Sequence, residues 1–468
     1  MPALLSYSHA QRSFCAREKH WGANISRFVL AVACAIATPA ALAGPLTPPP
    51  GPPSSTGKSL SEIERGIPIS ASNTPGDSNS LFRISAPGSY YLTQSIFGVP
   101  AATSAIEIAA SDVVIDLNGH SINGSFSVTE TTPAISSFGP RNVVVKNGSI
   151  KSWQSTGISA GNDGRVSNVH FDVVGGVDGS VGGNSAFIIE HCTFRASTHI
   201  RPQDGTIIHN CRFRDMTDAI QNPTADNVTI TDVVVIGTNG ETSGEAVIRL
   251  GDNAVVSRVA VRDERRGAIR VGANSVVSES VFTGATTGGG MNTGVRVGDA
   301  SIVRDTLVSR YGLSGIFTGD DCRITSNVSL SNGGAGIATG WRCLITGNLV
   351  TGNRSGFGIQ AGLRCMVMHN HVEHDVVPGY AIRAFDNSTV FQNVAVLNGI
   401  QVVGQDSLVD GNRIVASQGP SIVAGDGCLV IRNVYSGGGL AFSGFATFAS
   451  SVSGSAIDTA GPFSNIEF

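Results

Sequence analysis

Residues 315–330 read GIFTGDDCRITSNVSL, and residues 336–351 repeat the pattern as GIATGWRCLITGNLVT. The second stretch begins 21 positions after the first. Counting the first residue as zero, both carry glycine at positions 0 and 4, cysteine at position 7, isoleucine at position 9 and asparagine at position 12. Self-similarity at a short fixed period is the sequence signature of a solenoid.

The same columns extend over much of the chain. When each small residue followed by a β-branched residue is taken as the start of a coil, the usual step is 21 to 23 residues. Position 9 is β-branched in all nine coils that align. Position 4 is glycine in eight of the nine, with Phe385 as the exception: Gly251, Gly272, Gly298, Gly319, Gly340, Gly362, Gly404 and Gly425. Position 12 is asparagine in six consecutive coils: Asn327, Asn348, Asn370, Asn393, Asn412 and Asn433.

Stacked coils give these columns a common physical cause. In a parallel β-helix, equivalent residues lie about 4.8 Å apart along the axis. Valine then packs on valine inside, and asparagine amides form a hydrogen-bonded ladder at a bend. A leucine-rich repeat would show a leucine frame, and an α-solenoid would show a 3.6-residue period with few glycines; the sequence shows neither. We therefore predict an all-β protein, a single-stranded parallel β-helix of about 15 coils.

Composition agrees with this architecture. Of the 468 residues 14% are charged, against about 25% in an average soluble domain, and the 58 glycines indicate many turns. The formal net charge of −4 gives no reason to expect nucleic acid or an anionic membrane as a partner. A chain of this length can be one solenoid because each coil packs only on its neighbours.

The first residues are predicted to direct export. Residues 1–43 have the pattern of a signal peptide, because basic residues precede the apolar run FVLAVACAIATPAALA, which ends in small residues. The run is too short, and too interrupted by Thr and Pro, for a membrane span. Residues 44–57 are a Pro-rich linker. We expect the protein to be secreted, periplasmic or displayed at the cell surface.

The rest of the chain is divided into a cap, the solenoid and a tail. Residues 58–104 are predicted to hold an N-terminal cap and lead-in strands, where Ser59 and Glu62 form a capping-box pattern that opens a short helix. The β-helix is predicted over 105–439, and the tail 440–468 is predicted to pack on it. Position 8 is apolar in most coils: Val255, Val276, Ile302, Leu344, Met366, Leu408 and Leu429. An exposed apolar stripe favours a cover, so we expect the tail to cover it, with self-association as the alternative.

The columns and the opening EIAASDVVIDLNGHSI at 107–122 resemble the right-handed parallel β-helix of the pectate-lyase-like superfamily. The resemblance implies the fold. It implies no single activity, because this fold is found in lyases, hydrolases, epimerases and non-catalytic surface proteins.

The stretch TGDDC at 318–322 matches the GDDC segment of polygalacturonase-type hydrolases, where the resemblance would make Asp320 and Asp321 catalytic. The NTD, HG and RIK segments of those enzymes are missing here. The columns favour another interpretation, because Asp recurs at position 5 as turn chemistry. Cys322 falls in a column of Ala, Ser and Cys, which indicates a small buried side chain. Neighbouring coils bring cysteines within disulfide distance, but in-register parallel strands rarely offer the required dihedral, so we predict free thiols, with a disulfide as the alternative. We predict a turn and a packed thiol, and we leave the catalytic residues unknown.

The outward position 2 supplies the candidate binding residues, Arg249, Arg270 and Arg296, on consecutive coils. Guanidinium groups stacked this closely repel one another. They are either compensated by acids in adjoining turns, such as Glu245, Asp263 and Glu264, or they bind an acidic polysaccharide, because Arg holds carboxylate groups bidentately. Long loops over 234–246 and 283–293 precede these strands and would form walls.

The segment MHNHVEHD places His369, His371 and Glu373 at alternate residues, which on one strand would face the same side. The neighbouring coils offer poor metal ligands, so we predict a solvated polar edge and neither a metal site nor a cofactor. Outward acids that would mark a Ca²⁺ site of a uronate lyase are also lacking in the sequence.

These observations predict an exported β-helix protein that binds carbohydrate or associates with a surface without catalysis. The alternative is a polysaccharide-modifying enzyme, a lyase, hydrolase or epimerase, acting on an acidic glycan along the arginine column. The predicted partner is an acidic polysaccharide; the oligomeric state is left open by the sequence.

Overall fold

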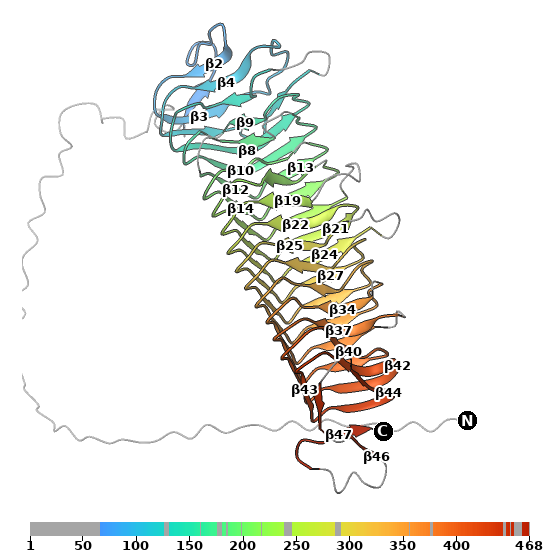
Figure 1. Ribbon diagram of the computed structural model, residues 1–468. Helices are drawn as coiled ribbons and strands as arrows, with labels where there is room; N and C mark the ends of the chain where they lie inside the picture. Colours follow the sequence, from blue (N-terminus) through green and yellow to red (C-terminus); the bar gives the residue numbers. More distant parts are fainter. Residues whose placement is uncertain are drawn as a thin grey trace, which may run out of the picture. The chain divides into compact units, whose positions relative to one another are not determined.

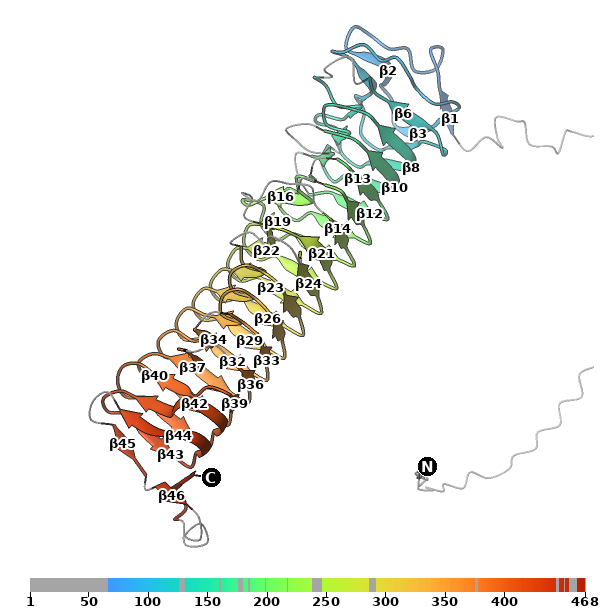
Figure 2. The ribbon, with the colours of Figure 1, turned by 90° about the vertical axis from the view of Figure 1, so that its right-hand side faces the viewer.

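The structure is a stack of β-coils. The computed structural model describes residues 66–468 without 126–130, 160, 176–179, 184–185, 198, 217, 238–245, 286–291, 355, 375–377, 443–445, 450, 454–460 and 468, and without the side chains of 263, 264, 442, 452 and 453. The chain divides into two units, Met1–Ser59 and Leu60–Phe468, and every described residue belongs to the second. Within that unit about 16 turns of chain wind into a parallel β-helix (Figures 1 and 2).

The predicted all-β solenoid is thereby confirmed. The described residues contain no helix, and so none that could cross a bilayer. The predicted signal peptide, linker and capping helix lie outside the described residues. Connections between neighbouring parallel strands of a sheet are right-handed in about 98% of cases, and the helix has this hand.

Each turn contributes short strands to three parallel sheets, and four long strands pass from one sheet into the next. Sheet 1 is formed by β2 (Ser80–Ile84), β4 (Ser104–Ile108), β7 (Ile135–Ser136), β9 (Ile158–Ser159), β11 (Val181–Gly182), β16 (Ile220–Asn222), β19 (Ala246–Leu250), β22 (Gly267–Val271), β25 (Val295–Val297), β28 (Ile316–Thr318), β31 (Ile337–Ala338), β34 (Phe357–Gln360), β37 (Tyr380–Ala384), β40 (Ile400–Val402) and the ends of β42 (Arg413–Ala424) and β44 (Val434–Phe442).

Sheet 2 is formed by β1 (Ile67–Ile69), β3 (Gly88–Leu92), β5 (Val113–Asp116), β8 (Val143–Lys151), β10 (Arg165–Asp172), β12 (Ile188–Glu190), β14 (Ile207–His209), β17 (Thr229–Thr231), β20 (Val255–Ser257), β23 (Val276–Ser278), β26 (Ile302–Arg304), β29 (Arg323–Thr325), β32 (Leu344–Thr346), β35 (Met366–Met368), β38 (Thr389–Phe391), β41 (Leu408–Asp410), β43 (Leu429–Ile431) and β45 (Thr447–Phe448).

Sheet 3 is formed by β6 (Ser121–Asn123), the ends of β8 and β10, β13 (Thr193–Arg195), β15 (Arg212–Arg214), β18 (Val234–Ile236), β21 (Ala260–Glu264), β24 (Val281–Gly284), β27 (Leu307–Ser309), β30 (Val328–Leu330), β33 (Leu349–Thr351), β36 (His371–Glu373), β39 (Val394–Val396), the starts of β42 and β44, β46 (Ser451–Ser453) and β47 (Asn465–Glu467).

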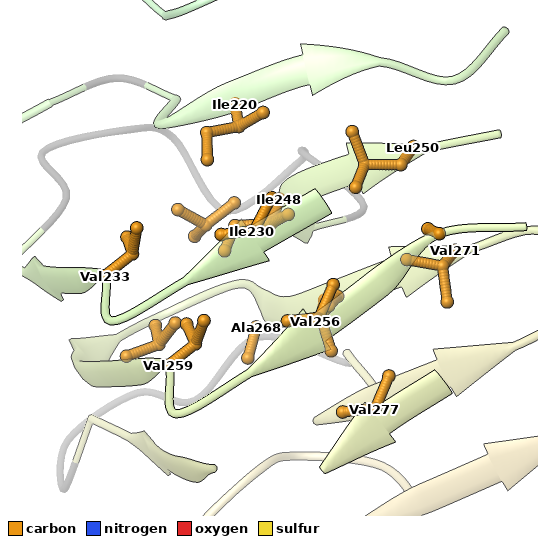
Figure 3. Close-up of a cluster of buried hydrophobic side chains, with 14 of the residues drawn as sticks. Ile220, Ile230, Val233, Ile248, Leu250, Val256, Val259, Ala268, Val271 and Val277 are labelled. Carbon is orange, nitrogen blue, oxygen red and sulfur yellow. The ribbon is translucent and has the colours of Figure 1, made fainter. Parts of the chain in front are cut away.

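The core is built from alternate residues of these strands. In β22, for example, Ile269 and Val271 are buried while Arg270 between them points outward. Figure 3 shows apolar side chains from successive coils in contact inside the coil. Burying one such Val or Ile side chain is worth roughly 1.5–3 kcal/mol. Near the N-terminal end the rings of Phe171, Phe194 and Phe213 stack with centroids 4.7 Å apart.

The asparagine column forms the predicted ladder, which is confirmed bond by bond. Nδ2 of Asn348 donates to Oδ1 of Asn370 at 2.9 Å, and the same oxygen accepts the backbone N–H of Asn348 at 3.0 Å. Equivalent pairs run from Asn327 to Asn433, and Asn465 of the tail adds one further member. The ladder therefore joins the later coils through buried amides.

Residues at the bends of each coil adopt the left-handed backbone conformation, which the sequence columns did not predict. Positions 6 and 11, on either side of each sheet 2 strand, have positive φ in coil after coil. The position 6 residues are Asn253, Asn274, Ala300, Asp321, Arg342, Arg364, Asn387, Asp406 and Gly427. The position 11 residues are Arg258, Glu279, Asp305, Ser326, Gly347, His369, Gln392, Gly411 and Arg432. Stacking therefore holds many non-glycine residues in a backbone conformation that they adopt only rarely elsewhere.

The two ends of the solenoid depart from the repeat. Strand pairing begins before Ala105, since β2 pairs with β4 and β1 pairs with β3. The lead-in strands are thus already coils. At the other end, Leu429 pairs with Thr447, and the tail continues the ladder. Three of the apolar position-8 side chains remain exposed, 41% for Val255, 44% for Met366 and 41% for Leu429, so the described part of the tail does not cover them.

Candidate functional site

The three candidate arginines form one column on the outer face of sheet 1. Arg249 in β19 lies beside Arg270 in β22, and Arg270 lies beside Arg296 in β25. Each points outward because its neighbours along the strand are buried. Coil stacking therefore repeats the guanidinium group at intervals of about 4.8 Å. The structure brings the three residues together as the sequence predicts.

A groove of about 380 Å³ runs along this column. Its lining includes the three arginines, and Phe317 of the next coil closes one end. The guanidinium carbon of Arg296 lies 5.4 Å from the centroid of the Phe317 ring, a cation–π contact that orients the arginine. Phe317 was not predicted as a site residue, although it occupies position 2 of its own coil, in the same column as the arginines.

An ion pair between Arg266 and Asp218 lies next to the coil that precedes Arg249. Nη1 of Arg266, a residue only 4% exposed, lies 2.6 Å from Oδ1 of Asp218. Nε2 of Gln221 donates to Oδ1 of Asp218 at 3.3 Å and to the carbonyl oxygen of Ala246 at 2.7 Å. Gln221 lies beside Arg249 in sheet 1, so this network holds in place the column side chain that precedes Arg249.

The column continues toward the N-terminal end. Ile200 bridges to Val181 on one side and Ile220 on the other, which places Arg201 in register with Gln221. Arg201 lines a second groove of about 330 Å³ together with Phe138, Ser159 and Gln203. Both grooves therefore lie on the outer face of sheet 1.

Carboxylates also line the main groove, and backbone groups hold them. Oδ1 of Asp252 accepts the N–H of Ala273 at 2.7 Å, and Oδ1 of Asp299 accepts the N–H of Asp320 at 2.8 Å. Of the acids expected to compensate the arginines, Glu245 and the side chains of 263 and 264 lie outside the described part of the structure.

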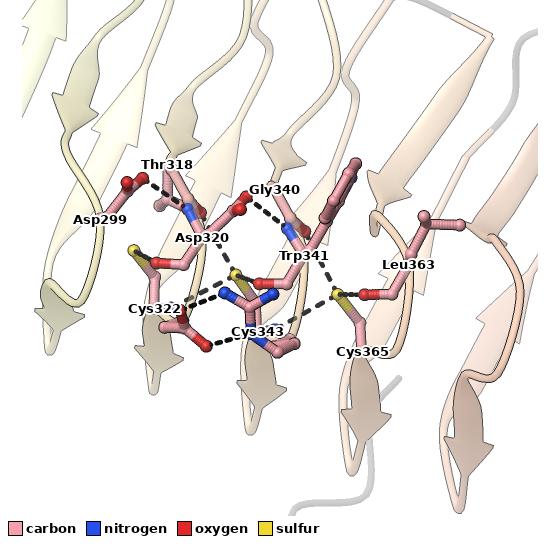
Figure 4. A network of polar contacts seen from close by, with 12 residues as sticks. Asp299, Thr318, Asp320, Cys322, Gly340, Trp341, Cys343, Leu363 and Cys365 are labelled. Carbon is pink, nitrogen blue, oxygen red and sulfur yellow. Dashed lines mark hydrogen bonds and ion pairs between the residues drawn. The ribbon is translucent and has the colours of Figure 1, made fainter.

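The stretch TGDDC is a bend, as predicted (Figure 4). Oδ1 of Asp320 accepts the backbone N–H of Trp341 at 2.8 Å. Asp321 has a φ of 56° and forms a bidentate ion pair with Arg342. Asp321 is exposed and pairs with Arg342 at the surface. The hydrogen bond from Arg342 lowers the pKa of the Asp321 carboxyl. Both carboxylates serve the turn.

Glycine is required for steric reasons at position 4, directly before the Asp of the turn. A Cβ at Gly319 would overlap Oδ1 of Asp299 in the preceding coil, and a Cβ at Gly340 would overlap Oδ1 of Asp320. The Gly-Asp column therefore interlocks: each carboxylate occupies the space that the next glycine leaves open.

The thiols act as hydrogen-bonding members of an inner column, a role beyond the predicted packing. The backbone N–H of Cys322 donates to Sγ of Cys343 at 3.4 Å, and the N–H of Cys343 donates to Sγ of Cys365 at 3.4 Å. Serine hydroxyls make the same bond in other coils, for example Oγ of Ser301 with the N–H of Ser275 at 3.1 Å. The six described cysteines are free and buried.

The segment MHNHVEHD does not present a single face, so the strand assumed for it is wrong. β35 ends at Met368 and β36 begins at His371, and His369 lies in the left-handed bend between them. A ring nitrogen of His369 is 2.8 Å from Oε1 of Gln392, and Oε2 of Glu373 accepts a hydrogen bond from Thr351 at 3.2 Å. These side chains pair with neighbouring coils.

Comparisons with known proteins identify related repeats. The family model described as "Periplasmic copper-binding protein (NosD)" matches residues 227–425; its periplasmic description agrees with the predicted location. A search of curated proteins found no match. The Dettilon tailspike protein is 13% identical, with a TM-score of 0.36 over 64% of this chain, which spans 62% of the tailspike's length.

Two further solved structures are of comparable similarity. The A-module of a mannuronan C-5 epimerase from Azotobacter vinelandii is 13% identical, with a TM-score of 0.28 over 81% of this chain and 90% of its own. The surface adhesin PfbA of Streptococcus pneumoniae is 12% identical, with a TM-score of 0.22 over 78% of this chain and 83% of its own. None of these similarities carries a functional argument.

The copper in the family description can be tested against the side chains present. Copper is held by thiolate, thioether and imidazole ligands. Across the described residues, no group of three or more His, Cys, Asp or Glu side chains is arranged to hold a metal ion. The described residues do not fit a copper site.

Proposed function

We propose that this chain, a right-handed parallel β-helix with the fold of the pectate-lyase-like superfamily, binds an acidic polysaccharide outside the cytoplasm without modifying it. The observation that carries this proposal is the column of Arg249, Arg270 and Arg296 lining one groove on sheet 1. Its spacing is set by the coil, so the charges repeat along a line.

A repeating anionic polymer is the ligand whose chemistry matches such a line. Arginine forms bidentate, charge-assisted hydrogen bonds with carboxylate or sulfate groups. A chain of linked uronate residues presents one carboxylate per sugar, at a repeat comparable to one coil. Phe317 at the end of the groove adds an apolar ring against which a sugar face can pack.

The carboxylates in the groove favour binding over hydrolysis. Hydrolysis of a glycosidic bond needs two carboxyl groups, one as acid and one as base or nucleophile. Oδ1 of Asp252 and Oδ1 of Asp299 each accept a hydrogen bond from a backbone N–H of the next coil, and Oδ1 of Asp320 does the same. Their role is to fix the turn, as in the coils where no groove is present.

Binding can be tested with a triple variant, R249A/R270A/R296A, on an array of acidic and neutral glycans, followed by isothermal titration calorimetry with the best ligand. We expect wild-type protein to bind uronate-rich glycans and the triple variant to lose at least about 100-fold in affinity, because charged hydrogen bonds are worth about 1.5–3 kcal/mol each. Affinity should fall as salt rises.

The matched control is R323A/R364A/R413A, which removes the same charge from exposed arginines away from the sheet 1 groove. If both triple variants weaken binding equally, the effect is one of net charge and the site is wrong. If the wild-type protein binds no acidic glycan, the proposed function is wrong. Release of unsaturated uronate or reducing ends by the wild-type protein would show an enzyme instead.

A further inference from the structure

Beyond the groove, the outward column of sheet 1 contains a further arginine, Arg383. From Arg296 the ladder passes to Phe317, Ala338, Gln360 and then Arg383, one residue per coil. Four steps of about 4.8 Å place Arg383 about 19 Å from Arg296 along the axis. The column residues between them carry no charge, so a neutral stretch separates the basic position at Arg296, the last arginine of the groove, from the basic position at Arg383.

Arg383 is held by aromatic rings on both sides. Its guanidinium carbon lies 4.7 Å from the ring centroid of Phe357 in the preceding coil and 4.9 Å from that of Phe385 in its own. The flanking Ile382 and Ala384 are fully buried, which fixes the side chain outward. Cation–π contacts of this kind orient a guanidinium without neutralising it.

Some outward arginines of the later coils have carboxylate partners. Arg342 pairs with Asp321, and Arg432 pairs with Asp410. Arg383 forms no ion pair with any residue that the structure describes, and its Nε is buried without a hydrogen-bond acceptor. The charge of Arg383 is thus positioned and partly desolvated, while the partner that such a group favours is missing.

Exposed aromatic surface lies between the two basic positions. Phe317 is 40% exposed in the column itself, and Trp341, in the turn after β31, is 52% exposed. Figure 4 shows the Trp341 ring projecting away from the thiol column. Aromatic faces pack against the apolar faces of sugar rings, so this stretch suits the body of a saccharide chain whose acidic groups engage the arginines at either end.

We propose that Arg383 is a second anion-binding subsite of the same track, and that the ligand is an anionic polysaccharide long enough to bridge Arg296 and Arg383. This inference rests on the proposed function, which it deepens by assigning a minimum length to the ligand. Two subsites on one polymer raise affinity because binding at the first makes binding at the second intramolecular.

The test compares a trisaccharide and a dodecasaccharide of galacturonate on wild-type and R383A protein by titration calorimetry. Only the longer oligomer spans both positions. We expect R383A to weaken binding of the dodecasaccharide by about tenfold, the effect of losing one charge-assisted hydrogen bond, and to leave the trisaccharide unchanged. Far-UV circular dichroism verifies folding. R383K, which keeps the charge but loses the planar stacking, should be intermediate.

Fluorescence gives an independent readout. Of the three tryptophans, Trp21 lies in the predicted signal peptide, Trp153 is fully buried and Trp341 is exposed, so in protein without residues 1–43 a change in emission on binding reports on Trp341. The dodecasaccharide should shift the wild-type emission, and W341F should abolish the shift. A matching pair of sulfated oligosaccharides distinguishes carboxylate from sulfate as the preferred group.

The outcomes separate the two proposals. If both oligomers bind, lose affinity in R249A/R270A/R296A and are unaffected by R383A, the groove stands and the second subsite is overturned. If R383A weakens both oligomers equally, Arg383 does not act at a distance and the subsite is again overturned. If wild-type protein binds neither oligomer of either chemistry, both proposals fall.

Discussion

Replacing Asn370 by alanine tests the coil-to-coil ladder on which every column depends. Oδ1 of Asn370 accepts the N–H and the Nδ2 of Asn348 at 3.0 and 2.9 Å. The two hydrogens of its Nδ2 are shared among three acceptors: the carbonyl oxygens of Ile345 and Met368 at 2.9 and 3.0 Å and Oδ1 of Asn393 at 3.0 Å. The residue is 1% exposed, so water does not replace these bonds without opening the coil.

The expected loss follows from that inventory. The backbone N–H of Asn348 is left without an acceptor, at a cost of about 1–3 kcal/mol. The bond from Nδ2 of Asn348 and the two N–H groups of the Asn370 amide contribute roughly 1 kcal/mol each. Since bonds in one network are not additive, we expect N370A to lower the free energy of unfolding by about 4–6 kcal/mol, which is large for one substitution. Urea unfolding followed by far-UV circular dichroism measures it.

The control is Q405A, which removes an exposed amide side chain two coils away and should change stability by less than about 0.5 kcal/mol. A double variant, N348A/N370A, should lose less than the sum of the two single losses, because the residues share two bonds. A loss below about 1 kcal/mol in N370A would refute the reasoning, since the ladder would then contribute little beyond what water supplies.

Two further predictions concern the bend. G319A should lower stability by about 1–3 kcal/mol through overlap with Asp299, and D299A in the same chain should recover part of it, seen as a double-mutant coupling in urea unfolding; strict additivity would contradict the interlock. The hydrogen bond from Arg342 holds the pKa of Asp321 below its ordinary value of 3.8, so the excess stability of wild type over D321N should be full above that value and vanish as pH falls through the lower folded pKa; a pH-independent difference would contradict the pairing.

Columns made of one residue type were readable from the sequence. The Asn ladder from Asn327 to Asn433 and the Gly-Asp turn were predicted because stacking places like residues in contact, and only amides, glycines or small side chains satisfy those contacts. The bends at positions 6 and 11 were not predicted. Ala300, Glu279 and His369 adopt left-handed backbone there, although such residues seldom signal it.

The unpredicted bend at position 11 also explains the wrong prediction for MHNHVEHD. Alternation along a strand places side chains on one face only while the strand continues, and a bend at His369 breaks the count. The arginine column, in contrast, was found because it lies inside the strands of sheet 1. What the sequence could not show is which rings hold those arginines, since the Phe357 contact to Arg383 joins residues of different coils.

The arginines of the column cannot form hydrogen bonds with one another. Elsewhere each column satisfies itself: asparagine bonds asparagine, and thiols and carboxylates accept backbone N–H groups of adjoining coils. A guanidinium has donors only and cannot bond its equivalent in the next coil. Like charges about 4.8 Å apart repel by about 1 kcal/mol even in water. The anionic polymer that we propose as the ligand would offer carboxylates at a similar repeat, which would reduce this repulsion along the column.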